Sequence, residues 1–131
     1  MSDASLQRIL YVDDEADIQE IVAMALELMG DVAIKTCGSG REALEVAEGF
    51  APDIILLDVM MPEMDGPTTM EALKRDPRFS ATPVVFVTAK ASARELERFR
   101  QLGAADVIAK PLDPLKLGDQ VRRIWERHNG R

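Results

Sequence analysis

The sequence contains almost no histidine and almost no cysteine. Among its 131 residues there is one of each, His128 and Cys37. Because His128 lies near the C-terminus, where chains usually fray, the sequence argues against a serine–histidine–aspartate triad, a cysteine–histidine pair or a multi-histidine zinc site. A lone cysteine cannot form an internal disulfide, which fits a reducing compartment. The side chains that remain for chemistry are mainly carboxylates.

Basic residues are also too few to balance the acids. The chain has 16 Lys and Arg against 23 Asp and Glu, which gives a formal net charge of −7. This balance argues against direct binding to nucleic acid and against docking on anionic membranes, since both need a basic surface. No apolar run approaches the roughly 18 residues that span a bilayer, and the N-terminus lacks the features of a secretory signal. We therefore expect a cytoplasmic protein.

Short apolar runs alternate with longer stretches of helical spacing along the whole chain. The predicted strands cover residues 8–12, 32–36, 53–57, 83–88 and 106–109. The predicted helices cover residues 18–29, 39–48, 67–75, 92–102 and 113–127. Alternating strands and helices imply a parallel sheet with both faces covered, because parallel neighbours need a crossover connection. The pattern predicts one α/β domain, a doubly wound (βα)5 fold, and leaves the strand order open.

Polar side chains lie at or just after the ends of four of the five predicted strands, where ligands bind in open α/β sheets. They are Asp13 and Asp14, Asp58, Thr88, and Lys110. If the first and third strands are neighbours, three carboxylates lie close together and repel one another. A Mg²⁺ ion suits such a group of oxygen ligands, and a lysine offsets the remaining charge. A carboxylate can itself attack phosphorus, a step that needs no histidine.

Each of these residues alone has an ordinary structural explanation. The Asp13–Asp14 pair could cap the following helix, Asp58 could be a turn residue, Thr88 could simply end a strand, and Lys110 could be a solvated lysine. Their joint placement at four strand ends is what favours a site.

Five motifs in a fixed order carry a resemblance to a known family. They are residues 11–15 (YVDDE), 58–66 (DVMMPEMDG), 87–89 (VTA), 102–104 (LGA) and 110–113 (KPLD). On these motifs the chain resembles the receiver domains of bacterial two-component response regulators over essentially its whole length. The resemblance implies a flavodoxin-like three-layer sandwich with strand order 2-1-3-4-5. It also implies a cis peptide between Lys110 and Pro111.

The resemblance implies a role for each candidate site residue. Asp58 matches the phosphoaccepting aspartate. Asp14 matches the direct Mg²⁺ ligand, Asp13 matches the acid that holds the metal through water, and the backbone carbonyl of Met60 matches a further metal ligand. Thr88 matches the hydroxyl that turns toward the phosphoryl group, and Lys110 matches the lysine that pairs with phosphate oxygens.

The resemblance also implies a function in phosphorelay signalling. A histidine kinase or histidine phosphotransfer protein would donate the phosphoryl group, and the chain would catalyse only its own phosphorylation and dephosphorylation. We expect a single stand-alone receiver domain over residues 1–131, with a core at about 7–128 and no output domain. It would then signal through an unknown downstream protein or pass phosphoryl groups along a relay. The fourth and fifth helices form the usual output or dimer face in this family, so a homodimer through them is one expected assembly.

The sequence departs from the family pattern at two positions, and a third position bears on the lifetime of the phosphoryl group. Val107 stands where many receivers carry a tyrosine or phenylalanine, and Leu112 stands where phenylalanine is common. The usual coupling between the threonine and an aromatic ring therefore cannot operate as such. Met60, two residues after Asp58, is bulky and apolar, and we expect it to hinder the attacking water and to lengthen the life of the phosphoryl group.

Three alternatives from other classes stay open at this point. A phosphorylation-independent scaffold with the receiver fold is disfavoured by the complete set of site residues. An aspartate-nucleophile phosphatase or phosphotransferase needs a second acid two residues after the nucleophile, where this chain has Met60. A nucleotide-binding protein is disfavoured because no glycine-rich phosphate loop occurs.

Overall fold

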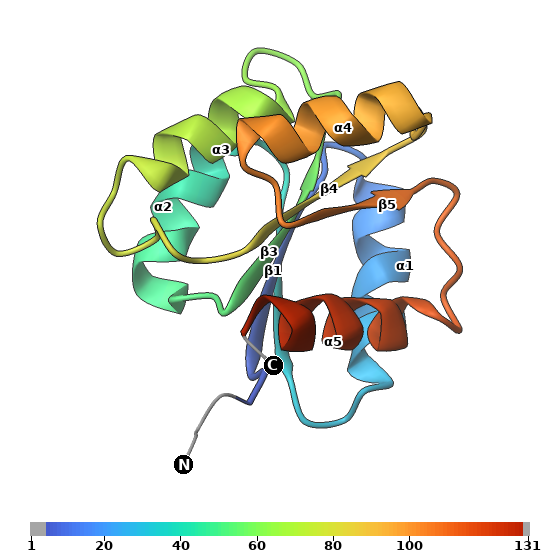
Figure 1. Ribbon diagram of the computed structural model, residues 1–131. Helices are drawn as coiled ribbons and strands as arrows, with labels where there is room; N and C mark the ends of the chain where they lie inside the picture. The colour runs from blue at the N-terminus through green and yellow to red at the C-terminus, as the bar shows by residue number, and fades with distance from the viewer. Residues whose placement is uncertain (1–4, 130–131) are drawn as a thin grey trace.

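Five parallel strands form the middle layer of the protein (Figure 1). The computed structural model describes residues 5–129. The strands are β1 (Arg8–Val12), β2 (Ala33–Cys37), β3 (Ile54–Asp58), β4 (Val84–Thr88) and β5 (Asp106–Ala109). Their order in the sheet is β2-β1-β3-β4-β5, and all neighbouring pairs are parallel. The predicted fold class and strand order are thereby confirmed.

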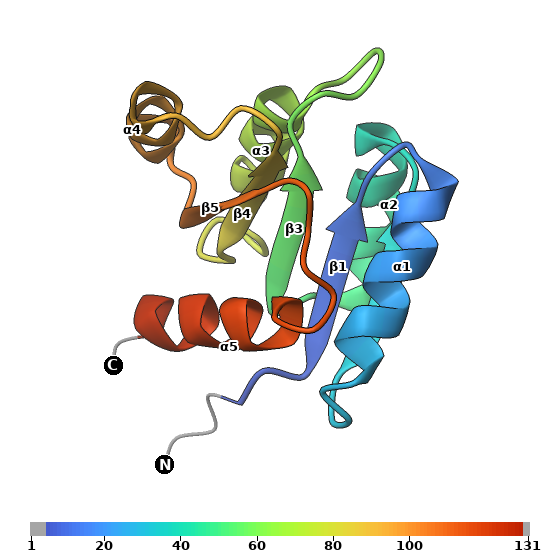
Figure 2. The same cartoon turned by 90° about the vertical axis from the view of Figure 1, so that its right-hand side faces the viewer.

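Helices cover both faces of the sheet, as Figures 1 and 2 show. They are α1 (Ala16–Glu27), α2 (Gly40–Phe50), α3 (Gly66–Lys74), α4 (Ala93–Leu102) and α5 (Leu117–His128). One hydrophobic core joins α1 and α5 to the sheet and includes Leu26 and Trp125. A second core joins α2, α3 and α4 to the opposite face and includes Leu73 and Phe99. The sheet is thus the one layer that both cores share. Within residues 5–129, no helix has the length and apolar character needed to cross a bilayer.

Capping residues set the ends of several helices. The side chains of Ser39, Asp65 and Ser92 accept hydrogen bonds from backbone N–H groups in the first turns of α2, α3 and α4. Such caps satisfy N–H groups that have no partner within the helix. Gly103 ends α4 with a φ of 110°, a conformation that glycine adopts without a steric cost.

Two details of the predicted elements were wrong. The prediction of strands buried on both faces holds for β3 and β4. It fails for β2, where Ala33 and Lys35 are exposed, and for β5, where Ala109 is exposed. The reason is that β2 and β5 are the two edge strands of the sheet. The last helix begins at Leu117 rather than at residue 113. Asp113 instead accepts a hydrogen bond from the Leu115 N–H through its side chain and stabilises a turn before the helix.

The loop between β3 and α3 passes very close to the end of β3. The Gly66 N–H donates to the Val59 carbonyl at 2.9 Å. A Cβ atom at position 66 would lie 2.6 Å from the Asp58 carbonyl oxygen and 2.9 Å from the Val59 Cα atom. Both neighbours are backbone atoms, so the loop would have to move to accept a side chain.

We expect Gly66→Ala to lower the free energy of unfolding by about 1–3 kcal/mol, because overpacked sites force backbone shifts of that cost. Gly49→Ala is the matched control, since no atom lies within 4 Å of the Cβ position at residue 49 in α2. That control should gain up to about 1 kcal/mol, the usual preference of a helix for alanine over glycine. Urea unfolding of both variants measures the difference, and equal stabilities would contradict the expected close approach.

Candidate functional site

Three carboxylates meet at the carboxyl edge of the sheet. β1 and β3 are neighbours, with Val12 opposite Leu57, so the residues that follow them come out side by side. Asp13, Asp14 and Asp58 each offer an oxygen atom, and these atoms lie within 4.8 Å of one another. Asp13 and Asp58 are buried, whereas Asp14 is exposed. The structure thus brings together the three acids that the sequence singles out.

Lys110 joins two of these acids. Its ammonium nitrogen lies 3.3 Å from Asp58 Oδ1 and 3.5 Å from Asp13 Oδ2. Burial lowers the pKa of Lys110, but the charges of Asp13 and Asp58 outweigh that effect and raise it overall. The lysine therefore stays protonated between the two carboxylates. The Lys110–Pro111 peptide that follows is cis, as the resemblance implies.

The environment of Asp58 makes its ionised form costly. Burial raises the pKa of this carboxyl, and the nearby charge of Asp13 raises it further. Lys110 and a hydrogen bond from the Met60 backbone act in the opposite direction, and the net result is a raised pKa. The negative charge at Asp58 is thus only partly compensated by the protein's own groups.

Asp13 is held by hydrogen bonds on every side. Its Oδ1 atom accepts from the Glu15 N–H at 3.0 Å, and its Oδ2 atom accepts from the Tyr11 hydroxyl at 2.7 Å. Its backbone N–H donates to the Cys37 carbonyl, and its carbonyl accepts from the Gln19 side chain at 2.7 Å. The sequence reasoning missed Tyr11 and Gln19. The spacing of Tyr11 two residues before Asp13 on a strand was a usable signal, since such residues share one face of a sheet.

Thr88 lies buried at the end of β4, next to Val87, which pairs with Asp58. Its hydroxyl oxygen accepts a hydrogen bond from the Lys90 N–H at 3.0 Å, and its carbonyl accepts from the Lys110 N–H at 2.8 Å. Thr88 therefore lies between Asp58 at the end of β3 and Lys110 just after β5. In this structure its hydroxyl is engaged with the start of the loop to α4.

The donor set fits a hard divalent cation. All three clustered side chains are carboxylates, and oxygen ligands of this kind suit Mg²⁺. Burial, and after it the charge of Asp13, raises the pKa of Asp58, and a cation among the three carboxylates would favour its ionised form. Among the described residues, Asp13, Asp14 and Asp58 are the group that could hold such an ion.

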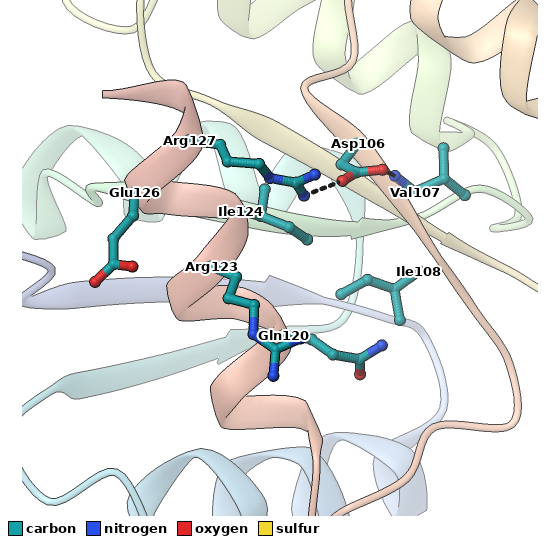
Figure 3. Close-up of a pocket in the computed structure, with 8 residues that line it drawn as sticks. All are labelled: Asp106, Val107, Ile108, Gln120, Arg123, Ile124, Glu126 and Arg127. Atoms are coloured by element: carbon teal, nitrogen blue, oxygen red, sulfur yellow. Dashed lines mark hydrogen bonds and ion pairs between the residues drawn. The ribbon is translucent and has the colours of Figure 1, made fainter. Parts of the chain in front are cut away.

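Two predicted neighbours of the site lie in contrasting surroundings. The Met60 side chain is 69% exposed, so it projects into solvent beside Asp58 instead of packing in the core. Val107 is partly buried on β5 and packs against the core beneath α4. A groove of about 670 Å³ lies between β5 and α5. Figure 3 shows residues that line it, with Val107 and Ile108 on β5 and Arg123 on α5. A salt bridge of 2.7 Å from Arg127 to Asp106 connects the two sides.

Comparison with known proteins gives one consistent result. A family model described as the response regulator receiver domain matches residues 9–122. The chain is 36% identical over 128 residues to the DNA-binding response regulator MtrA of Mycobacterium tuberculosis, covering 97% of this chain and 54% of that protein. It is 34% identical over 119 residues to the response regulator Rre1 of Synechocystis, covering 91% and 52%. The chain thus spans about half the length of the curated relatives it matches.

Solved structures agree with this match. The chemotaxis protein CheY4 of Vibrio cholerae superposes with a TM-score of 0.84 at 29% identity, covering 92% of this chain and 99% of that one. The signal receiver domain of a histidine kinase from Syntrophus aciditrophicus has a TM-score of 0.79 at 33% identity, covering 92% and 91%.

We expect Asp58→Asn to stabilise the protein in buffer free of divalent cations at neutral pH. The amide is similar in shape and removes the charge that burial and Asp13 disfavour. Above the ordinary aspartate pKa of about 4, the folded protein binds more protons at Asp58 than the unfolded chain does. The free energy of unfolding of the wild type should therefore fall as pH rises through that window, and it should fall less in the variant. Thermal unfolding at several pH values measures this, and a less stable variant with an unchanged pH slope would contradict it.

Proposed function

Because the chain belongs to the family of response regulator receiver domains, we propose that it accepts a phosphoryl group on Asp58 from a histidine kinase or a histidine phosphotransfer protein. The observation that carries the proposal is the convergence at one sheet edge of Asp58, two further carboxylates and a lysine that contacts Asp58 at 3.3 Å. Receiver domains are signalling modules of two-component systems, and we propose that this one passes its signal through protein contacts or along a phosphorelay.

The proposed reaction is a transfer between two side chains. One carboxylate oxygen of Asp58 attacks the phosphorus of a phosphohistidine on the donor protein. A P–O bond to Asp58 forms, the P–N bond to the donor imidazole breaks, and that nitrogen leaves with the electron pair of the broken bond. A small donor such as acetyl phosphate loses acetate instead. Either way the product is an aspartyl acyl phosphate.

Lys110 and the clustered acids prepare the site for this charge. The phosphoryl group brings additional negative oxygens to a place where three carboxylates already repel one another. Lys110, held between Asp13 and Asp58, is placed to pair with an incoming phosphoryl oxygen. We propose that Asp14 binds Mg²⁺ directly, with Asp58 and the Met60 carbonyl, and that Asp13 holds it through water. When bound, the ion would supply positive charge that offsets the acids and the phosphoryl oxygens.

Thr88 completes the proposed set. Its hydroxyl oxygen bonds the Lys90 N–H in this structure, and its hydrogen can be donated elsewhere. We propose that the hydroxyl turns to donate to a phosphoryl oxygen once Asp58 is modified. That rotation would withdraw its oxygen from Lys90 and so alter the start of the loop to α4. Because Val107 offers no aromatic ring to follow the threonine, the loop itself is the route by which this chain would pass the change outward.

The direct test is phosphorylation by acetyl phosphate followed by intact-protein mass spectrometry. We expect the wild type to gain the mass of one phosphoryl group in the presence of Mg²⁺ and to gain none when EDTA removes the ion. Asp58→Asn should gain none under either condition. Asp119→Asn is the matched control, since Asp119 is an exposed aspartate on α5, and it should behave like the wild type. No gain by the wild type under any condition would favour a phosphorylation-independent scaffold instead.

The exposed side chain of Met60 gives a prediction for the lifetime of the phosphoryl group. It follows Asp58 by two residues, is apolar and is exposed, and we propose that it hinders a water molecule that approaches the acyl phosphate. We expect Met60→Asn to raise the dephosphorylation rate about tenfold, which corresponds to a barrier lower by about 1.4 kcal/mol. Loss of the phosphoryl mass with time after removal of the donor measures the rate.

A second exposed methionine provides the control for that experiment. Met24 on α1 is 64% exposed, close to the value for Met60, and lies outside the acid cluster. Met24→Asn should leave the dephosphorylation rate unchanged. If Met60→Asn also leaves it unchanged, the shielding role of Met60 is wrong.

A further inference from the structure

Among the described residues, the hydroxyl group of Tyr11 donates the shortest hydrogen bond that the Asp13 carboxylate accepts. The two groups are 2.7 Å apart, and both residues are fully buried. The ring of Tyr11 belongs to the core beneath α1 and α5, and its hydroxyl reaches the edge of the sheet where the acids cluster. A tyrosine at this position thus does more than fill the core, because its one polar atom ends on a carboxylate of the candidate site.

The direction of this hydrogen bond is set by chemistry. An ionised carboxylate can only accept, so the phenol donates. The hydroxyl oxygen of Tyr11 lies 2.7 Å from Asp13 Oδ2, within hydrogen-bond distance of that single carboxylate atom. A hydrogen bond from a neutral donor to a buried carboxylate is among the stronger ones in proteins. With the Glu15 N–H on Oδ1 and Tyr11 on Oδ2, the plane of the Asp13 carboxylate is held at both oxygens.

Tyr11 shares its acceptor atom with Lys110. The lysine nitrogen is 3.5 Å from the same Asp13 Oδ2 atom and somewhat closer, 3.3 Å, to Asp58 Oδ1. Without the phenol, that buried Oδ2 atom would have Lys110 as its remaining side-chain partner among the described residues. The lysine would then be drawn toward Asp13 and away from Asp58. The phenol therefore also affects how Lys110 divides its contacts between the two acids.

We propose that Tyr11 is a positioning residue whose hydroxyl orients Asp13 toward the divalent cation and leaves Lys110 available to Asp58. This inference rests on the proposed function, because it assigns Tyr11 a part in the same cation site. Groups that hold the ligands of a metal in place typically change its affinity by tenfold or more when they are removed.

Tyr11→Phe tests the inference, since it removes the hydroxyl and keeps the buried ring. We expect the dissociation constant for Mg²⁺, measured by isothermal titration calorimetry on the unphosphorylated protein, to rise at least tenfold. The Mg²⁺ concentration that half-saturates phosphorylation by acetyl phosphate should rise equally. The rate at saturating Mg²⁺ should stay within about threefold of the wild type, because Tyr11 touches no reacting atom. An unchanged Mg²⁺ affinity would overturn the proposal.

A core substitution on the same strand separates positioning from loss of stability. Ile9 lies in the same core as Tyr11, and Ile9→Val removes one buried methylene without touching a polar group. It should lower the unfolding temperature and leave the Mg²⁺ affinity unchanged. If Ile9→Val weakens Mg²⁺ binding as much as Tyr11→Phe does, the effect belongs to stability and the proposal fails.

The wild type offers a measurement that does not depend on a variant that folds. Tyr11 is the one tyrosine in the sequence, so its ring carbons can be labelled with ¹³C and observed without ambiguity. The signal of the hydroxyl-bearing carbon should shift as Mg²⁺ is added, with the half-saturation found by calorimetry. If Mg²⁺ binds and this signal does not move, Tyr11 is not coupled to the cation. If the wild type does not bind Mg²⁺ at all, the proposed function fails first.

Discussion

Repulsion between carboxylates at one edge of the sheet is the constraint on which the site depends. Asp13 follows β1, Asp58 is the last residue of the neighbouring β3, and both are buried, so their charges lie where water cannot screen them fully. The fold keeps them there because the strands themselves are anchored by cores on both faces. Lys110 compensates part of the charge, and the raised pKa of Asp58 shows that compensation to be incomplete. Such a group of carboxylates favours the binding of a cation. The free energy of unfolding of the protein then depends on the protons or cations that neutralise the carboxylates.

The two buried acids, Asp13 and Asp58, differ in the groups that hold their side chains in place. Asp13 is held by the backbone of its own loop, by Gln19 of α1 and by the phenol of Tyr11. Asp58 has fewer partners, namely Lys110 and the Met60 backbone, and lies beside a loop that Gly66 keeps close. Asp13 therefore has more hydrogen-bond partners at its carboxylate than Asp58 has. This difference suits a pair in which one carboxylate organises the site and the other reacts.

Much of the fold follows from local patterns in the sequence. The strand at residues 8–12 and the strand at 106–109 are predicted to the residue, because short β-branched runs between helical stretches are a strong signal. The order of the strands came from the resemblance, since periodicity carries no information on which strands are neighbours. The exposure of β2 depends on its place at the edge of the sheet. Before α5, which starts at Leu117, the Asp113 side chain accepts a hydrogen bond from the Leu115 N–H. No periodic pattern in the sequence encodes either feature. Similarly, the sequence predicts the acids Asp13, Asp14 and Asp58 at the strand ends. The hydrogen bond from Tyr11 to Asp13 is seen only in the side-chain geometry.

The layered arrangement has an evolutionary consequence. The three clustered acids of the described residues lie at the ends of β1 and β3, and none of them is on α1, α4 or α5. Under the proposed function, substitutions on the surfaces of these helices would change protein contacts and leave the acid cluster in place. Duplicated copies of such a gene can therefore diverge into separate circuits that share one chemical step and differ only in what each helix surface recognises.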